Sequence, residues 1–389
     1  MDWLSALAAV ALAAWLYLLL GRDGFWRARP RIEDEAPPTP ASWPAVVAIV
    51  PARNEAAHVE AALRSLLAQD YPGDLAVILV DDHSDDGTAA IGRRLAAGQA
   101  RALEVIAARA LPPGWSGKLW AIAEGLRHGA QAWPGAAYVL LTDADIAHAP
   151  GSLTRLVAKA EAERLDLASL MVKLHCVSCW EHLLIPPFVF FFAKLYPFAA
   201  VNDPGRSTAA AAGGCMLVRR RALEEAGGIA AIRSELIDDV ALARAIKRRA
   251  GGGRIWLGLT GSTTSLRRYD RLTEIWAMVA RSADTQLRHS FARLAATVVG
   301  MGVAYLIPPL AVLAGVVGGD RLASGLGLAA WIAMAAAYRP TANLYRLAPP
   351  WLLSLPLAAA LYAAMTVDSA IQHRRGAGGR WKGRVFSPQ

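Results

Sequence analysis

The stretch AVVAIVPARNEAAHVEAALRSLLAQ (residues 45–69) decides the expected fold. Its first eight residues are apolar and predict a short buried strand, whereas residues 54–69 carry apolar side chains at helical spacing. The alternation continues along the chain, with further expected strands at 75–82, 102–108 and 138–145 and further expected helices at 87–97 and 117–131. This order predicts an α/β fold, a Rossmann-like and mostly parallel sheet with helices on both faces.

Polar residues follow three of the expected strands. The sequences are PARNE (51–55), DDHSDDGT (81–88) and TDAD (142–145). A solvated loop can place acidic residues after one strand without any function, but three such loops in one sheet are harder to explain that way. Because ligands collect at the carboxyl ends of parallel strands, we expect a ligand site at this edge of the sheet.

An uncharged segment, residues 3–20, is long enough to cross a bilayer. A cleaved signal peptide is the alternative, but no basic segment precedes the run and no small-residue cleavage site follows it. Four arginines lie soon after the segment, at positions 22, 27, 29 and 31. This asymmetry predicts an anchor over residues 1–21 in the inner membrane, with an external N-terminus and most of the chain in the cytoplasm.

A basic, Pro-rich linker is expected over residues 22–44, ahead of a cytoplasmic domain over 45–285. Apolar stretches return at 292–317, 321–338 and 350–371, and they predict transmembrane or re-entrant helices within residues 290–372. Three spans would leave the basic tail, residues 373–389, outside, whereas basic segments beside membrane spans usually stay in the cytoplasm. Since Pro308 and Pro309 also interrupt the first stretch, the number and topology of these spans stay open.

The composition favours a membrane-associated protein, with 55% hydrophobic residues. The formal net charge is +9, but much of the excess lies beside apolar segments, where it can meet anionic lipid. No nucleic-acid-binding motif accompanies it, so we expect no nucleic-acid partner. Cys176 and Cys179 lack the ligand spacing of common tetrahedral zinc sites and are expected to be reduced thiols.

Five segments taken together, VPARNE, VDDHSDDGT, GWSGK, LLTDAD and LIDDVALA, resemble a family 2 glycosyltransferase of the GT-A fold. The resemblance covers about residues 46–250. GWSGKLWA, PFVFFFAKLYPF and IDDVALARAIK are most similar to the hopanoid-biosynthesis-associated glycosyltransferases. The resemblance implies a nucleotide-diphosphate sugar as donor, with a UDP-sugar expected, and a divalent cation, Mg²⁺ or Mn²⁺, that neutralises the leaving diphosphate.

The resemblance also implies roles for individual residues on the donor side. Asp145 would bind the metal, Asp143 would lie near the ribose, diphosphate and metal, and Asp82 would hold the uracil or ribose. The remaining donor residues would be Pro51, Ala52, Glu55 and Lys118. Simpler roles stay open: Lys118 as a surface side chain, Asn54 as a helix cap, and Asp85 and Asp86 as caps of the helix that begins near Thr88.

On the acceptor side, the resemblance implies Asp239 as general base, supported by Asp238. Both also suit the positive end of the helix expected over 234–249, which is the simpler explanation. Gly213 and Gly214 would border the acceptor pocket. Gln286 and Arg288 would keep part of a Q-x-x-R-W motif whose tryptophan is missing here, so a single transfer is expected instead of processive polysaccharide synthesis.

The apolar segment LLIPPFVFFFAKLYPFAAV (183–201) is expected to lie at the membrane interface, because two adjacent prolines make a poor core helix. The expected partners are therefore the bilayer and a lipid acceptor. The tail GRWKGRVF (379–386) resembles the W-[RK]-x-R-x-[YF] ending of lipid-glycosylating relatives. Alternatives are a polyprenyl-phosphate or sphingolipid-type glycosyltransferase, a polysaccharide synthase and a non-catalytic scaffold. The sequence does not predict the oligomeric state.

Overall fold

The computed structural model describes residues 3–98 and 101–375, and the backbone of residues 380–381 and 384–385. The chain divides into two compact units. The sheet unit is built mainly from Arg29–His175 and Ala200–Arg267. The helical unit is built from three segments, Met1–Ala28, Cys176–Ala199 and Arg268–Arg380. The predicted tail motif at 379–386 lies largely outside the described residues.

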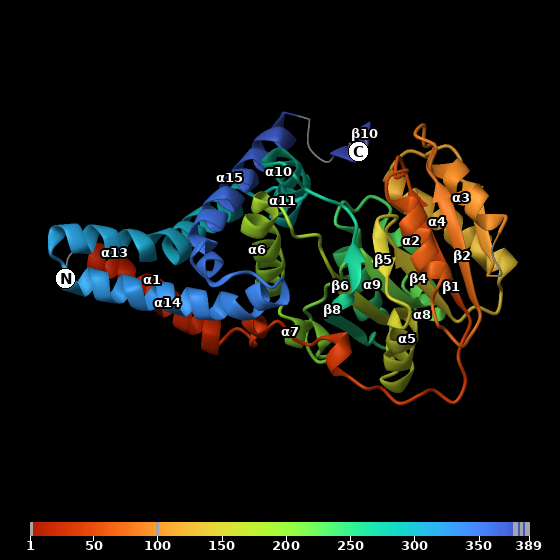
Figure 1. Cartoon of the computed structure of the whole chain (residues 1–389), viewed down its shortest axis with the longest axis horizontal. Coiled ribbons are helices and arrows are strands. Elements are labelled where there is room, and N and C mark those ends of the chain that lie inside the picture. The colour runs from red at the N-terminus through yellow and green to blue at the C-terminus, as the bar shows by residue number, and fades with distance from the viewer. Residues whose placement is uncertain (1–2, 99–100, 376–379, 382–383, 386–389) are drawn as a thin grey trace. The chain divides into compact units, whose positions relative to one another are not determined.

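An eight-stranded sheet forms the centre of the sheet unit, in the order β3-β2-β1-β4-β7-β6-β8-β5 (Figure 1). The strands are β1 Val46–Ala52, β2 Leu75–Asp81, β3 Leu103–Ala107, β4 Tyr138–Thr142, β5 Ile146–His148, β6 Leu167–Lys173, β7 Cys215–Arg219 and β8 Ile255–Ser265. The first four strands are parallel, as predicted. The other half is mixed, because β7 runs antiparallel to both neighbours and β5 antiparallel to β8.

Helices cover both faces of the parallel half, as the alternation of side chains along a buried strand requires. Gly125 of α4 (Gly117–Ala132) lies against Ile49 and Val80, whereas Gly92 of α3 (Thr88–Ala96) lies against Leu79 and Val105. Leu79 and Val80 are adjacent in β2, so the two helices pack on opposite faces. The other helices of this unit include α2 Val59–Leu67, α5 Ser152–Ala162, α8 Arg220–Glu225 and α9 Asp238–Arg248.

The predicted linker is partly structured. The 3₁₀ turn η2 (Ile32–Asp34) buries Ile32 in the core of the sheet unit. Glu33 accepts hydrogen bonds from the Thr260 hydroxyl at 2.6 Å and from the Gly261 N–H at 2.9 Å. These bonds outweigh burial and lower the pKa of Glu33. Part of the segment therefore docks on β8 through local polar groups, whereas the linker over all of 22–44 stays a prediction.

The helical unit contains α1 Trp3–Leu20, α6 Cys179–Leu195, α10 Leu272–Ala280, α11 Ala283–Gln286, α12 Phe291–Met301, α13 Ile307–Gly318, α14 Arg321–Leu344 and α15 Leu355–Arg374 (Figure 1). α7 (Phe198–Asn202) crosses the boundary between the units. By length and composition, three helical segments could cross a membrane: Trp3–Leu20, Phe291–Gly318 and Arg321–Leu344. The apolar stretch at 350–371, which becomes mainly α15, is not among them.

The two prolines in the first C-terminal stretch do not break it. A π-helical turn, Gly302–Leu306, precedes α13, whose first residues include Pro308 and Pro309. Since proline has no N–H, Pro308 leaves the carbonyl of Ala304 without its usual helical donor. The indole N–H of Trp15 in α1 donates to that carbonyl at 2.6 Å. A side chain from another helix thus satisfies the group that the proline leaves open.

The segment at 183–201 also differs from its prediction. Residues 179–195 form α6, with Pro186 and Pro187 inside it and a capping box between Ser178 and Glu181. Phe190 is 1% exposed and packs against Tyr338 in α14. The expectation that this stretch makes a poor core helix was therefore wrong, because aromatic side chains of the helical unit cover it. Its first part belongs to the helical unit and not to the sheet unit.

Candidate active site

Two carboxylates follow β4 at the carboxyl edge of the parallel strands. The strand ends at Thr142, and Asp143 and Asp145 come directly after it. The ammonium group of Lys118, the second residue of α4, lies 2.9 Å from Asp143 and 3.2 Å from Asp238. Lys118 therefore connects the end of β4 with the start of α9, two segments that the sequence predicted separately.

Asp239 is fixed by backbone groups on both of its oxygens. Its Oδ2 accepts a hydrogen bond from the Gly213 N–H at 2.9 Å, and its Oδ1 accepts one from the Val240 N–H at 2.7 Å. Burial and the neighbouring charge of Asp238 nevertheless raise the pKa of Asp239 to about 6. A carboxylate with this pKa suits a general base, since it is mostly ionised near pH 7 and still accepts a proton readily.

Lys118 and its neighbouring carboxylates shift one another's pKa values. Burial opposes the charge on Lys118, but Asp143, Asp238 and Asp239 together outweigh it and raise the pKa of the ammonium group. The pKa of Asp143 is raised by burial, and the attraction of Lys118 only partly offsets that effect. The cluster thus holds one cation among three carboxylates, a surplus of negative charge that favours a further cation.

Arg267 connects two other predicted residues. Its Nε donates to Asp145 at 3.0 Å, and its terminal nitrogen donates to both oxygens of Glu55 at 2.6 and 2.8 Å. Ser265 also donates to Asp145, at 3.4 Å. The sequence analysis did not single out Arg267 or Ser265. Ser265 is the last residue of β8, and Arg267 lies two residues beyond it. β8 pairs with β5, which begins immediately after Asp145. No local sequence pattern predicts that pairing.

The loops after β1 and β2, which contain predicted donor residues, are joined by polar contacts. Pro51 and Ala52 end β1, and the Asp82 N–H donates to the Ala52 carbonyl at 2.8 Å. Asp82 is buried, and Arg53 donates to its carbonyl oxygen at 2.6 Å. Asn54 does not cap α2: its φ is +52° and its side chain accepts from the Asp85 N–H at 3.0 Å. It therefore holds the two loops together.

The short loop before β7 gives the acceptor-side glycines different surroundings. A Cβ atom on Gly213 would lie 3.4 Å from the Lys118 ammonium and 3.5 Å from Asp239. The Gly214 carbonyl accepts from Thr142 at 2.8 Å. His148 contacts the same hydroxyl at 3.0 Å, and burial lowers the pKa of His148 to about 4. Gly213 thus borders the carboxylate cluster directly, and Gly214 supports the strand end below it.

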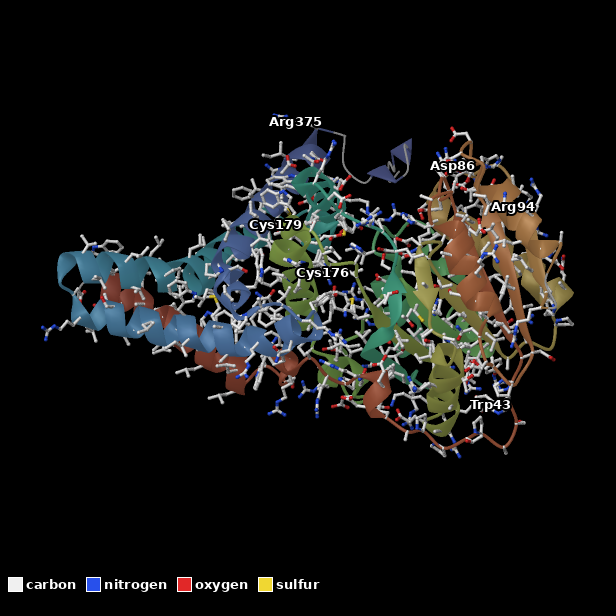
Figure 2. All side chains as sticks on the ribbon, in the orientation of Figure 1. Trp43, Asp86, Arg94, Cys176, Cys179 and Arg375 are labelled. Carbon is white, nitrogen blue, oxygen red and sulfur yellow. The ribbon has the colours of Figure 1, made fainter. Side chains whose placement is uncertain are left out.

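The structure does not bring every predicted site residue into this cluster. Gln286 and Arg288 belong to the helical unit, where Gln286 donates to the Tyr196 hydroxyl at 2.6 Å. Their acceptor-side role stays a prediction. Cys176 and Cys179, labelled in Figure 2, are not in disulfides. Among the residues that the structure describes, they join no cluster of three metal-ligating side chains.

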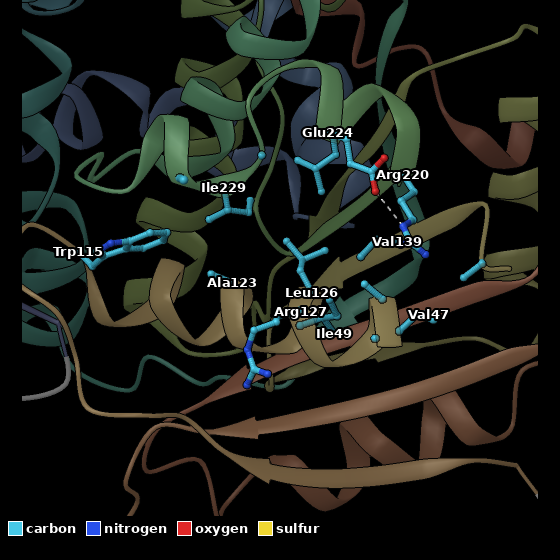
Figure 3. Close-up of a pocket in the computed structure, with 16 residues that line it drawn as sticks. Val47, Ile49, Trp115, Ala123, Leu126, Arg127, Val139, Arg220, Glu224 and Ile229 are labelled. Atoms are coloured by element: carbon cyan, nitrogen blue, oxygen red, sulfur yellow. Dashed lines mark hydrogen bonds and ion pairs between the residues drawn. The ribbon is translucent and has the colours of Figure 1, made fainter. Parts of the chain in front are cut away.

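A pocket of about 290 Å³ lies on the α4 face of the sheet (Figure 3). Val47, Ile49 and Val139 form its floor, and Arg220 and Glu224 pair at 3.0 Å on one side. None of the predicted donor, metal or base residues lines it. The charged residues predicted for the site lie instead at the carboxylate cluster.

Comparison with known proteins finds a match to one family model over part of the chain. Residues 47–227 match the model of the family described as glycosyl transferase family 2. These residues include the expected donor and metal residues and end before Asp238 and Asp239. The chain is therefore a glycosyltransferase, with a family 2 domain over most of its sheet unit. The comparison with curated proteins found no match.

Several solved structures are similar to this chain. A mannosyltransferase from Pyrobaculum calidifontis, solved with GDP-Man and Mn²⁺, is 23% identical over 95% of this chain and 99% of its own, with a TM-score of 0.57. TarS 1–349 from S. aureus, solved with UDP-GlcNAc, is 15% identical over 89% of this chain and 97% of its own, with a TM-score of 0.41. Glucosyl-3-phosphoglycerate synthase from Mycobacterium tuberculosis is 21% identical over 63% of this chain and 78% of its own, with a TM-score of 0.41. The first likeness identifies the sheet unit as a GT-A fold.

Proposed function

We propose that this chain transfers a sugar from a nucleotide-diphosphate sugar to the hydroxyl group of a lipid, with inversion at the anomeric carbon. The observation that supports this most directly is the position of Asp239. It is a buried carboxylate with a pKa of about 6, linked through Asp238 and Lys118 to Asp143 at the end of β4. A base and a donor-side carboxylate are thus held in one cluster.

The carboxylates fit a divalent cation of the hard, oxygen-binding class, Mg²⁺ or Mn²⁺. Asp145 and Asp143 would hold it, and when bound it would neutralise charge on the donor diphosphate. Asp145 and Asp143 pair with Arg267 and Lys118, but Lys118 also pairs with Asp238, so negative charge remains for such an ion to balance. The P. calidifontis enzyme, solved with Mn²⁺, supports this assignment through its shared fold.

The proposed reaction is a single displacement. Asp239 accepts the proton of the acceptor hydroxyl as that oxygen forms a bond to the anomeric carbon. The bond between that carbon and the diphosphate oxygen breaks, and the nucleoside diphosphate leaves with the electron pair. Lys118 and Arg267 provide positive charge on the donor side, where negative charge develops. Attack opposite to the leaving group inverts the configuration.

A lipid acceptor is supported by the helical unit. We propose that α1, Phe291–Gly318 and Arg321–Leu344 cross the inner membrane, with the N-terminus outside and the sheet unit in the cytoplasm. Two C-terminal spans return the chain to the cytoplasmic side, which places α15 and the basic segment 373–384 inside in agreement with the charge rule. This arrangement removes the conflict that three C-terminal spans create.

Among lipids, we propose a hopanoid or a molecule made alongside it, on the strength of the sequence strings that resemble that subfamily. A UDP-sugar remains the expected donor, and GDP-mannose is the alternative to test because the P. calidifontis neighbour was solved with GDP-Man. One residue separates Gln286 from Arg288 where Q-x-x-R-W has two, and histidine follows Arg288 in place of the tryptophan. A single transfer therefore fits better than polymer synthesis.

The test uses membranes that contain the full chain, supplied with a panel of labelled UDP- and GDP-sugars and Mg²⁺ or Mn²⁺. We expect label in the organic phase with one donor, and its loss in Asp239→Asn and Asp145→Ala. Asp74→Asn, an exposed carboxylate outside the cluster, should retain activity. Mass spectrometry of the product separates a hopanoid from a polyprenyl phosphate or a sphingolipid. Nucleotide-sugar binding without transfer to any lipid would contradict a lipid acceptor, and no binding would favour a scaffold.

A further inference from the structure

Three metal-ligating side chains meet in the helical unit, apart from the carboxylate cluster of the sheet unit. They are Asp284, His289 and His373, and their ligand atoms all lie within 4.8 Å of one another. Asp284 is buried, His373 is half-buried and His289 is exposed. The group therefore has one fixed carboxylate and a side open to solvent.

The chain bends sharply to place His289 beside Asp284. Arg288 and His289 have φ values of +53° and +54°, a left-handed conformation that costs energy for residues other than glycine. The turn lets the His289 N–H donate to the Asp284 carbonyl at 3.1 Å, and it brings Nδ1 to 2.7 Å from the Asp284 carboxylate. The sequence thus maintains two consecutive strained residues at the point where the histidine joins the group.

Helix α15 fixes the third side chain relative to the first. The Asp284 N–H donates to the Ser369 hydroxyl at 3.0 Å, and that hydroxyl donates to the carbonyl of Ala280. Ser369 and His373 are four residues apart in α15 and so lie on the same helix face. The contact that positions Asp284 therefore also aligns His373 with it.

The two imidazole rings lie almost parallel, with centroids 4.0 Å apart and planes inclined by 16°. Neutral imidazole is the form that binds metals. Two imidazoles and one carboxylate make a ligand set that zinc and other borderline transition metals accept, with a further position left for water.

We propose that Asp284, His289 and His373 bind a divalent transition metal of the zinc class. Zinc–nitrogen bonds of about 2.0–2.1 Å bring neighbouring ligand atoms roughly 3–3.5 Å apart, so the ligand atoms, now within 4.8 Å of one another, would move closer when the ion binds. The bound metal links the turn after α11, which contains His289, to the end of α15, which contains His373. It differs in chemistry from a cation at Asp143 and Asp145, where the ligands are oxygen atoms alone.

The test uses the full-length chain in detergent, freed of metal by chelation and then titrated with Zn²⁺ in excess Mg²⁺, which occupies the oxygen-ligand site. We expect one equivalent of tightly bound Zn²⁺ by elemental analysis and calorimetry, and a Zn²⁺-dependent rise in the midpoint of thermal unfolding. Co²⁺ in place of Zn²⁺ should give visible absorption typical of low coordination number. Asp145→Ala should bind Zn²⁺ as the wild type does.

Variants separate metal binding from a purely structural contact. His289→Ala and His373→Ala should each weaken Zn²⁺ binding by more than the roughly 10–100-fold that loss of an outer-shell partner costs. Asp284→Asn keeps an oxygen that can accept from His289, so it should preserve metal-free stability while weakening Zn²⁺ binding. His182→Ala is the matched control, a histidine of the same unit outside the group.

Two results would overturn the proposal. One is the absence of stoichiometric Zn²⁺ in the wild type at micromolar concentration. The other is equal Zn²⁺ affinity in the wild type and Asp284→Asn when both unfold at the same temperature without metal. Because the readout is metal binding and not sugar transfer, either result leaves the proposed glycosyl transfer to be judged separately.

Discussion

The guanidinium of Arg267 lies 3.0 Å from the carboxylate of Asp145. It also binds Glu55, so one side chain joins the loop after β1 to the proposed metal ligand. Asp145 and Glu55 have side chains only 13% and 11% exposed. Arg267 therefore neutralises two nearly buried carboxylates in the protein without donor.

Arg267→Met should leave those two carboxylates without their cation. Without metal, we expect the free energy of unfolding to fall by about 1–3 kcal/mol. This is less than the full cost of breaking a buried ion pair, because the Arg267 side chain is 30% exposed. Mn²⁺ should then raise the unfolding midpoint more than it does in the wild type. Thermal unfolding with and without Mn²⁺ measures both effects. Arg64→Met, which breaks an exposed helical pair, is the control and should change little. An unaltered Mn²⁺ response would contradict this account.

Asp239 should make stability depend on pH in a defined direction. Its pKa is about 6 in the folded chain and about 3.9 when unfolded. The folded state thus binds more protons between these values, so this contribution is present below about pH 4 and is lost as pH rises through 6. Unfolding measured from pH 4 to 7 should show the wild type losing about 2–3 kcal/mol relative to Asp239→Asn. A constant difference across this range would show that the carboxyl is not perturbed.

Lys118 should set the pH at which the proposed base, Asp239, becomes active. Its positive charge lowers the pKa of Asp239 against the effects of burial and Asp238. In Lys118→Met we therefore expect the acidic limb of the pH profile of kcat/KM to move above its wild-type position near pH 6, by about one unit or more. Lys118→Arg keeps the charge and should shift the limb less. If both variants lose activity with no change in the profile, Lys118 acts only on the donor.

The close contact of α4 with the sheet should make Gly125 intolerant of a larger residue. A Cβ atom there would lie 2.6 Å from Ile49 and 2.9 Å from Val80. Overpacking of this kind costs about 1–3 kcal/mol, more than the roughly 1 kcal/mol that alanine gains in a helix. Gly125→Ala should lower the unfolding midpoint. Gly135→Ala, where a Cβ atom has no neighbour within 4 Å, should be nearly neutral, and equal midpoints would refute the packing argument.

The parts of the site that were predictable are those with a local pattern. Asp143 and Asp145 follow an apolar run, and Asp238 and Asp239 begin a helix, so both pairs stand out in the sequence alone. Arg267 does not, because it contacts Asp145 only through the pairing of β5 with β8. The direction of β7 and the burial of Phe190 depend likewise on partners far along the chain. Local periodicity carries no information about them.

The hydrogen bond from Trp15 to Ala304 links a helix made early in translation to one made much later. Until residue 304 is synthesised, the indole of α1 lacks this acceptor, and the carbonyl that Pro308 leaves open lacks this donor. Helix α1 is thus a partner in the assembly of the helical unit. A foreign helix of equal length and hydropathy without this indole would leave the later helix with an unmet polar group in an apolar environment.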